Sequence, residues 1–501
     1  MLNLTERGWS FLLFFSLAAQ ATVAFSNERC QSGKKPPSCR TEKASEDTPE
    51  EKQFERAGPP RAPLFHNLRF QEDWSWLREE TDRDAYHSLK FIPLSQDGRH
   101  YLSLGGELRG RSEFWSGFGF GSRRPDADTF GLLRTRLHGD LQLGGPVRVF
   151  VEGKSALAAG RQLPGGFRTL DVDAVDVQNA FVDFHIPAGG DRRLTVRTGR
   201  QELQFGRQRL VSPLDWANTR PRIFDGFRAS VRGSDWQADG FWTRQVRVRK
   251  YSFNTRDSGV DFYGLYAVAP SVLASSSLEF YWLGLDRTVG ASSERRHTTG
   301  GRLGGRLGQS PWDIDVEGAY QFGSFSGGEG PTGIRAYMLA WQLGYNLAKN
   351  GRPRFTVGLD YASGDRDPTD RRQRTFDPLF PLGHAYLGYI DAVGRRNVFA
   401  LSQGLSYSPV MRLKLDLDGH FFWLAKRGDA LYDAGGQVLR AGDPSAPRRT
   451  GTEIDLTGSF RLDRRLTATS GYSRFFAGPF LKATGAARDA NFGYLALQFL
   501  W

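Results

Sequence analysis

Hydrophobic and polar residues alternate along most of this chain, and the segment 411–423 shows the pattern clearly. It reads MRLKLDLDGHFFW, with leucine or an aromatic residue at most odd positions and a charged residue at most even positions. Successive side chains of a β-strand point to opposite faces of the sheet. The segment therefore predicts a strand with one apolar and one charged face. The apolar face carries Leu413, Leu415, Leu417, Phe421 and Trp423, and the charged face carries Arg412, Lys414, Asp416, Asp418 and His420.

The same alternation recurs in about eighteen segments between residue 101 and the last residue. In 128–143, for example, Leu133, Leu137 and Leu141 oppose Arg134 and Arg136. We therefore predict an all-β chain with about eighteen strands. The segments are 101–115, 128–143, 146–156, 175–186, 193–203, 224–233, 235–246, 260–270, 276–287, 298–308, 312–322, 334–346, 352–363, 395–408, 410–424, 450–463, 465–476 and 488–501.

The connections between these segments form two sets of different length that alternate along the chain. Outer-membrane β-barrels combine tight periplasmic turns, long extracellular loops and an even number of strands. A propeller or a sandwich would not separate its connections in this way. We therefore predict a transmembrane antiparallel β-barrel over 101–501 in the bacterial outer membrane, with its apolar faces toward lipid. The short connections are 144–145, 234, 309–311, 409 and 463–464, and the long ones are 157–174, 204–223, 364–394 and 425–449.

The last strand fits this barrel. Leu495, Leu497, Phe499 and Trp501 occupy alternate positions. Lipid satisfies no backbone hydrogen bond, so only a closed sheet without open edges is stable in the membrane. A terminal strand of this kind resembles the signal that the barrel-assembly machinery reads, and we expect this machinery and outer-membrane lipid as partners.

The residues before the barrel predict three further regions. Residues 1–24 predict a signal peptide, because Arg7 precedes an apolar run that ends in a small-x-small site at Ala19-Gln20-Ala21. Residues 25–64 are polar and proline-rich and predict a disordered periplasmic leader. Residues 65–100, with Asp73-Trp74-Ser75, predict an irregular lead-in.

Two cysteines, Cys30 and Cys39, lie in the leader. In an exported protein a nearby pair favours a disulfide, because two thiolates alone do not complete a zinc site. A pair of free thiols is the alternative. We expect no metal and no cofactor.

Charge defines the expected lumen. The chain of 501 residues has 67 Lys and Arg against 55 Asp and Glu. A lumen of eighteen strands is too wide for side chains to fill, and arginine or lysine on its wall favours anions. For any single wall arginine, pairing with a neighbouring carboxylate such as Glu107 is the alternative role. The residues predicted to line the pore are Arg109, Arg111, Arg134, Arg136, Lys154, Arg197, Arg228, Arg412 and Lys414.

The long connection after residue 203 is the most distinctive stretch. Residues 199–227 read GRQELQFGRQRLVSPLDWANTRPRIFDGF, with Arg207, Arg209, Arg220 and Arg222 in the connection and only one acid, Asp215. Long loops are often functional. We predict that it folds into the lumen and forms a constriction whose four arginines bind the substrate.

The chain also resembles the alginate export porins of bacterial outer membranes. The resemblance covers about 65–501 and implies an eighteen-stranded barrel whose arginine-rich constriction, with Arg207 and Arg209, passes a polyuronate or a related exopolysaccharide outward. It also implies periplasmic secretion components as further partners. Gln178 and Asn179 depart from the family, which has an Arg–Glu pair there. The matching motifs are 73–75, 104–109, 199–203, 205–210, 224–226, 363–365, 376–381 and 471–476.

Other functions fit the sequence less well. The eight histidines show no HExxH spacing, no GxSxG motif is present, and GGRLGGRLG at 300–308 follows no Rossmann-like strand, so we expect no enzyme and no catalytic residue. The arginines follow strands at period two, which does not favour nucleic acid as a partner. An adhesin barrel without conductance and a general anion- or oligosaccharide-selective uptake porin remain as alternatives.

Overall fold

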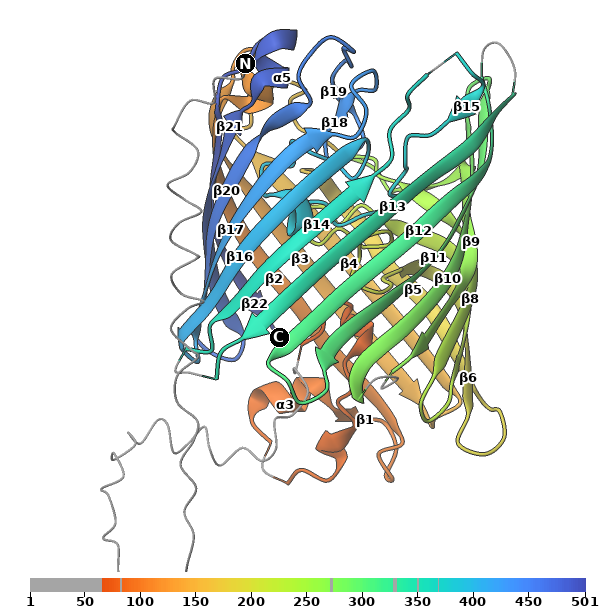
Figure 1. The fold of residues 1–501 in the computed structure, drawn as a ribbon. Coiled ribbons are helices and arrows are strands. Elements are labelled where there is room, and N and C mark those ends of the chain that lie inside the picture. The colour runs from red at the N-terminus through yellow and green to blue at the C-terminus, as the bar shows by residue number, and fades with distance from the viewer. Residues whose placement is uncertain (1–64, 82, 271–273, 328–330, 349–350, 368) are drawn as a thin grey trace, which may run out of the picture. The chain divides into compact units, whose positions relative to one another are not determined.

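The computed structural model describes residues 65–81, 83–270, 274–327, 331–348, 351–367 and 369–501 (Figure 1). Within these ranges, 18 long strands pair with their neighbours in antiparallel fashion, and β22 pairs with β2 to close the barrel. Each of the eighteen predicted segments coincides with one of these strands. The predicted signal peptide, the leader and both cysteines lie outside the described residues.

The eighteen wall strands are β2 (His100–Ser116), β3 (Ala127–Leu143), β4 (Val147–Ala159), β5 (Asp173–Pro187), β6 (Arg193–Glu202), β7 (Ile223–Arg232), β8 (Gln237–Arg247), β9 (Thr255–Ala269), β10 (Ala274–Val289), β11 (Ser292–Leu307), β12 (Trp312–Ser326), β13 (Pro331–Asn346), β14 (Arg354–Ala362), β16 (Val398–Val410), β17 (Leu413–Leu424), β20 (Arg449–Arg461), β21 (Leu466–Ala477) and β22 (Ala490–Leu500).

Short elements lie before the barrel and in the connections. They are η1 (Arg69–Gln71), η2 (Ser75–Arg78), α3 (Ala85–Lys90), β1 (Ile92–Pro93), η3 (Phe118–Gly121), β15 (Arg372–Gln373), α4 (His384–Leu387), β18 (Leu431–Tyr432), β19 (Val438–Arg440) and α5 (Pro479–Thr484). None of the helices in the described ranges is long and apolar enough to cross a membrane.

The strand that shows the sequence pattern most clearly has the expected two faces. On β17 the outer side chain of Leu417 is 46% exposed, whereas His420, on the other face, is 7% exposed. Exposed leucine and aromatic side chains cover the outside of the wall in the same way on other strands, including Leu495 and Leu497 of β22. This outer surface is the one that faces lipid.

The two ends of the barrel differ in their connections. α3 and β1 lie at the lower, periplasmic end in Figure 1, and β15, β18, β19 and α5 lie at the upper, extracellular end. The alternation of connection length is not strict, because β10 and β11 are joined at the upper end by Gly290 and Ala291 alone. Gly290 adopts a φ of 59°, which a two-residue hairpin turn of this kind requires.

A register shift in β5 places two neighbouring polar residues on the inside. Opposite Glu152 and Gly153 of β4, the pairing passes from Asn179 directly to Val177, so that Gln178 is the extra residue. A bulge of this kind re-aims side chains. As a result, both Gln178 and Asn179 are fully buried in the interior.

The lead-in 65–98 enters the barrel from the periplasmic end. Phe70 packs edge-on against Phe150 and Phe181, with ring centroids 5.9 and 5.2 Å away. These two phenylalanines belong to the inner face of β4 and β5, where they are buried. In addition, Arg148 of β4 donates a hydrogen bond of 2.7 Å to the Phe70 carbonyl. Residues around Phe70 therefore occupy part of the lumen.

Arg69 binds the seam where the barrel closes. Its guanidinium donates to the carbonyl oxygens of Gly106 on β2, at 2.8 Å, and of Trp501 after β22, at 3.1 Å. It also forms an ion pair with Glu72. Arg69, Glu72 and Gly106 are buried, so the loss of one of these partners would leave a buried donor or acceptor unsatisfied and lower the stability.

We expect Arg69→Gln to lower the free energy of unfolding by about 1–3 kcal/mol, because the variant leaves Glu72 buried without its ion-pair partner. The measurement is the temperature at which the folded, compact band is lost in cold-loaded gels. Arg99→Gln is the control, because Arg99 is exposed and pairs with Asp97, which is also exposed. Equal melting temperatures for Arg69→Gln and the wild type would contradict this role.

Lys90 is a second buried cation in the lead-in, outside the membrane-spanning strands. Its ammonium group lies 5.1 Å from the ring centroid of Trp74 and 5.6 Å from that of Tyr86. Burial lowers the pKa of Lys90 to about 7, although the Glu72 carboxylate opposes the shift. Between this value and the ordinary pKa of 10.5, the unfolded chain holds a proton that the folded chain has released. The free energy of unfolding therefore rises with pH across that window.

We expect the melting temperature to rise from pH 6.5 to pH 9.5 by more in the wild type than in Lys90→Met. The variant lacks the titrating group and is already more stable at pH 6.5. Lys482→Met, in α5 at the opposite end, should keep the pH dependence of the wild type. If the melting temperatures of the wild type and Lys90→Met changed equally with pH, the pKa of Lys90 would not be lowered in the folded protein.

Candidate functional site: an inward loop and two lumen cavities

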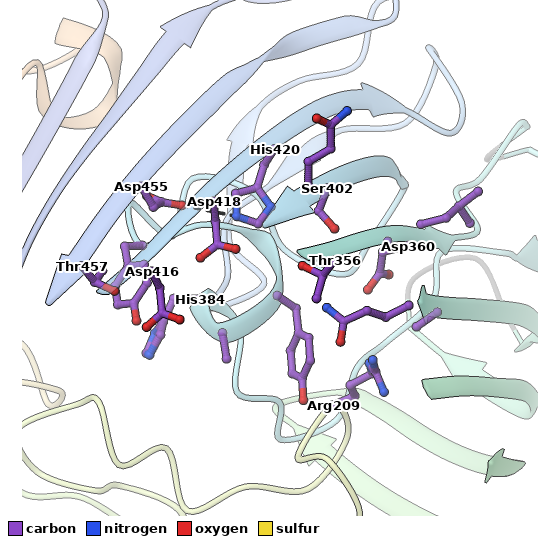
Figure 2. Close-up of a pocket in the computed structure, with 18 of the residues that line it drawn as sticks. Arg209, Thr356, Asp360, His384, Ser402, Asp416, Asp418, His420, Asp455 and Thr457 are labelled. Atoms are coloured by element: carbon purple, nitrogen blue, oxygen red, sulfur yellow. Dashed lines mark ion pairs between the residues drawn. The ribbon is translucent and has the colours of Figure 1, made fainter. Parts of the chain in front are cut away.

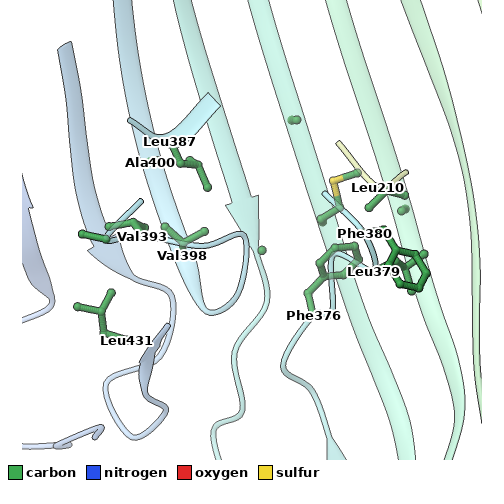
Figure 3. Packing of buried hydrophobic residues seen from close by; sticks show 14 of the residues in the cluster. Leu210, Phe376, Leu379, Phe380, Leu387, Val393, Val398, Ala400 and Leu431 are labelled. Atoms are coloured by element: carbon green, nitrogen blue, oxygen red, sulfur yellow. The ribbon is translucent and has the colours of Figure 1, made fainter. Parts of the chain in front are cut away.

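The connection between β6 and β7, residues 203–222, folds into the lumen as predicted from its length. Leu203, Leu210 and Val211 are buried in one apolar cluster with Phe376 and Phe380 of the connection 363–397 (Figure 3). The two connections also share backbone hydrogen bonds, from Ser212 N to Phe380 O and from Phe380 N to Leu210 O, both of 2.9 Å. They form one packed body inside the barrel.

Basic side chains of the wall hold the loop by its backbone. These side chains come from neighbouring strands β2, β3 and β4, and each donates to a loop carbonyl. The hydrogen bonds run from Arg109 to Asp215 (3.0 Å), from Arg111 to Trp216 (2.8 Å), from Arg134 to Asp215 (2.9 Å) and from Lys154 to Thr219 (2.8 Å).

A network of ion pairs reinforces these contacts. Arg134 contacts Glu107 at 2.5 Å and Asp215 at 2.8 Å, and Arg220 of the loop contacts Asp215 and, at 2.7 Å, Glu202. Burial would raise the pKa of the Asp215 carboxyl, but the guanidinium groups of Arg134 and then Arg220 lower it well below its usual value. Asp215 therefore stays ionised and attracts both arginines.

The buried amides of the β5 bulge complete this network. Asn179 donates to Glu152 at 2.7 Å and to Glu202 at 3.1 Å, and Gln178 donates to Glu202 at 2.8 Å. Arg136 pairs with Glu152 at 2.7 Å and Glu107 at 2.9 Å. Thus the two residues that depart from the exporter motif supply neutral donors to two buried carboxylates.

The basic residues predicted to line the pore have different surroundings. Arg109, Arg111, Arg134, Arg136 and Lys154 are buried behind the loop and line neither of the two cavities described below. Two others pair with wall acids, Arg197 with Asp183 at 2.7 Å and Arg228 with Asp239 at 2.8 Å. Arg412 lies exposed in the turn before β17, and Lys414 lines a cavity.

The four loop arginines are also separated. Arg207 has a side chain that is 56% exposed, whereas that of Arg209 is 3% exposed and contacts Asp315 at 2.5 Å and Glu317 at 3.1 Å. Arg220 faces the wall network, and Arg222 donates to the carbonyl of Pro381. Only Arg207 and Arg209 therefore border open space in the two cavities.

The larger cavity, which we call the vestibule, has a volume of about 790 Å³ near the periplasmic ends of β11–β14. Two of its arginines are compensated, since Arg354 pairs with Asp313 at 2.6 Å and Arg302 with Asp315 at 2.5 Å. Its charged lining consists of Arg207, Arg302, Arg306, Arg352 and Arg354 together with Asp313 and Asp315. We did not predict its four wall arginines from the sequence, although three of them flank short turns at one end of the barrel.

The smaller cavity, which we call the chamber, has a volume of about 260 Å³ (Figure 2). Gln342 lines both cavities, so the chamber and the vestibule adjoin each other. Its charged lining consists of Arg209, Asp360, Lys414, Asp416, Asp418 and Asp455, with His384 and His420 beside them. In the described ranges, no group of three or more His, Cys, Asp and Glu side chains could hold a metal ion.

We expect Arg134→Met to loosen the loop, because it removes a main cation from buried Glu107 and from half-buried Asp215. Breaking one side of a buried ion pair costs about 3–5 kcal/mol. The expected results are a lower melting temperature and larger fluctuations of single-channel current in planar bilayers. Arg244→Gln, which breaks a partly exposed pair with Asp261, should change both much less. If Arg134→Met had the conductance and the current fluctuations of the wild type, Arg134 would not be needed to hold the loop.

Comparison with known proteins agrees with the barrel. Similar solved structures include a BenF-like porin from Pseudomonas fluorescens Pf-5 (TM-score 0.53, 12% identity, 80% of this chain and 98% of that chain). Another is Pseudomonas aeruginosa OpdK with vanillate (TM-score 0.52, 12% identity, 79% of this chain and 98% of that chain). A third is Pseudomonas aeruginosa OccK8 (OprE), with a TM-score of 0.52, 12% identity and coverage of 80% and 98%. At these identities the likeness shows the fold alone.

The family comparison is more specific. A search of curated protein sequences finds no match. The family model for alginate export, however, matches residues 100–494, which include nearly the whole barrel. Family and fold are those of outer-membrane channels rather than enzymes. The chain therefore belongs to the alginate export family of outer-membrane β-barrels.

Proposed function

We propose that this barrel passes an anionic polysaccharide, an alginate-like polyuronate or a related exopolysaccharide, across the outer membrane. The observation that carries the proposal is the charge of the vestibule, whose lining has five arginines and two aspartates. A guanidinium group binds a carboxylate through two parallel hydrogen bonds. The excess of arginines therefore suits a chain of uronate units.

The vestibule also offers arginines that are available to a substrate. Arg306 and Arg352 are exposed, and no carboxylate of the described ranges pairs with either. Arg207, at the edge of the inward loop, lies 3.7 Å from Asp315 and keeps half of its side chain exposed. A cavity lined by one sign of charge concentrates ligands of the opposite sign and accelerates their entry. These three residues would make the first contacts with a polymer arriving from the periplasm.

The main contacts with the substrate would then lie in the vestibule and not at the buried arginines of the wall. Periplasmic secretion components that deliver a polymer would meet the same end of the barrel, where the lead-in lies. The small volume of the chamber, about 260 Å³, favours a second candidate, an uptake porin for oligosaccharides. Dependence of the block on chain length separates the two, because only a polymer channel should bind long uronate chains more tightly than monomers.

The test is block of the channel by uronate oligomers added from the periplasmic side of a planar bilayer. We expect the variant Arg207→Gln, Arg306→Gln, Arg352→Gln to weaken this block about tenfold or more. The reason is that hydrogen bonds to a charged group contribute about 1.5–3 kcal/mol each. Its control is Arg192→Gln, Arg193→Gln, Arg232→Gln, which removes three exposed arginines from the same end outside both cavities. Equal block in both triple variants would refute the vestibule as the entry site.

A further inference from the structure

The chamber carries the opposite charge from the vestibule. Asp416 and Asp418 project into it from β17, and Asp455 projects from the neighbouring strand β20 (Figure 2). In the register of these strands, Asp418 stands directly opposite Asp455, and His420 directly opposite Glu453. Like charges opposite each other on neighbouring strands destabilise a sheet. The pair of Asp418 and Asp455 therefore destabilises the wall at the chamber.

The cations of the chamber are already occupied. Arg209 contacts two acids outside the aspartate pair, Asp315 and Glu317. Lys414 lies 2.8 Å from Asp416, with which it forms an ion pair. Asp360, on the far side of the chamber, is bound at 2.5 Å by Arg395. None of these cations forms an ion pair with Asp418 or Asp455.

Asp455 is a second, separate indication that the chamber takes a ligand. The residue is 1% exposed, yet neither of its carboxylate oxygens accepts a hydrogen bond from any described residue. Its ionisable neighbours are the ring of His420, 3.3 Å away, and the carboxyl group of Glu453, another acid. Asp418 likewise forms no ion pair with the side chains that the structure describes, and lies in the same cavity. Buried acceptors without donors favour a donor from outside the protein.

We infer that the chamber is a subsite for sugar units that carry an ammonium group, with Asp418 and Asp455 as its acceptors and Asp416 beside them. The inference rests on the proposed passage of a saccharide. A protonated amine supplies the positive charge and the hydrogen-bond donors that these carboxylates lack. Tyr386, Thr356 and Ser402 line the same chamber and suit the hydroxyl groups of a sugar ring.

The opposite charges of these two adjoining cavities then specify the substrate further. A carboxylate binds in the vestibule, and an ammonium group binds beyond Gln342. The class of polymer that satisfies both is a polysaccharide with acidic and amino sugars in one chain. A continuous polyuronate would bind the vestibule and meet repulsion at the chamber, because pore walls select by the sign of their charge.

Three probes in planar bilayers test the chamber: an oligoglucosamine with free amines, its fully N-acetylated neutral form, and a uronate oligomer. We expect the wild-type channel to be blocked more strongly by the free-amine oligomer than by the acetylated one. The variant Asp416→Asn, Asp418→Asn should weaken block by the free-amine oligomer about tenfold and leave block by the acetylated oligomer unchanged. In a salt gradient, its reversal potential should move toward anion selectivity.

The control is Asp191→Asn, Asp235→Asn, which removes two exposed acids from periplasmic turns outside both cavities. Asp418→Asn alone repeats the test with a residue that has no ion-pair partner to lose, and a wild-type melting temperature verifies its fold. Free-amine block that persists in both chamber variants, or no preference of the wild type for the free amine, would overturn the inference. A failure of the proposed function would give a different result: the uronate oligomer would block the channel equally well with and without the vestibule arginines.

Discussion

The interior of this barrel depends on the charge network around Asp215. A lumen of eighteen strands would be a wide water channel if its loops stayed outside. Arg134 of the wall and Arg220 of the loop share the Asp215 carboxylate, while Glu107 and Glu202 balance the two guanidinium groups from either side. Both guanidinium groups, Glu107 and Glu202 are buried, and Asp215 is 39% exposed, so the loop cannot move away without leaving buried charges unpaired. The network thus fills the β2–β7 side of the lumen and leaves the cavities along β11–β14, β16, β17 and β20.

The arrangement of strands could be predicted from the sequence, because a period of two appears in most of them, although the bulge at Gln178 interrupts it in β5. The inward course of the 203–222 loop could also be predicted from its length and arginines. The burial of the wall arginines could not be predicted from the sequence. Alternation shows that Arg109 and Arg134 face inward, but it carries no information on what lies across the lumen. Their partners, Asp215 and Trp216, are about 80 to 110 residues away in the chain.

The cavities were harder to predict for a related reason. Arg306, Arg352 and Arg354 lie near turns, where charged residues are ordinary solvated side chains in most proteins, and only the closed barrel gathers them around one space. The acids of β17 were visible in the sequence as part of a mixed wall. In the chamber, these acids outnumber the bases that are free to pair with them. The reason is that Asp315, Glu317 and Asp360 bind nearby arginines, and only the folded structure shows these pairs.

The contact of Arg69 with the closing seam has a consequence for the order of assembly. Its acceptors are the carbonyls of Gly106, on the first wall strand, and of Trp501, after the last one. The second acceptor comes into position only when β22 has paired with β2. The lead-in therefore gains its full set of bonds after the cylinder has closed, so its docking marks the completion of the wall. A channel whose last strand is misplaced would leave this segment loose at the periplasmic mouth, where proteases act on unfolded chains.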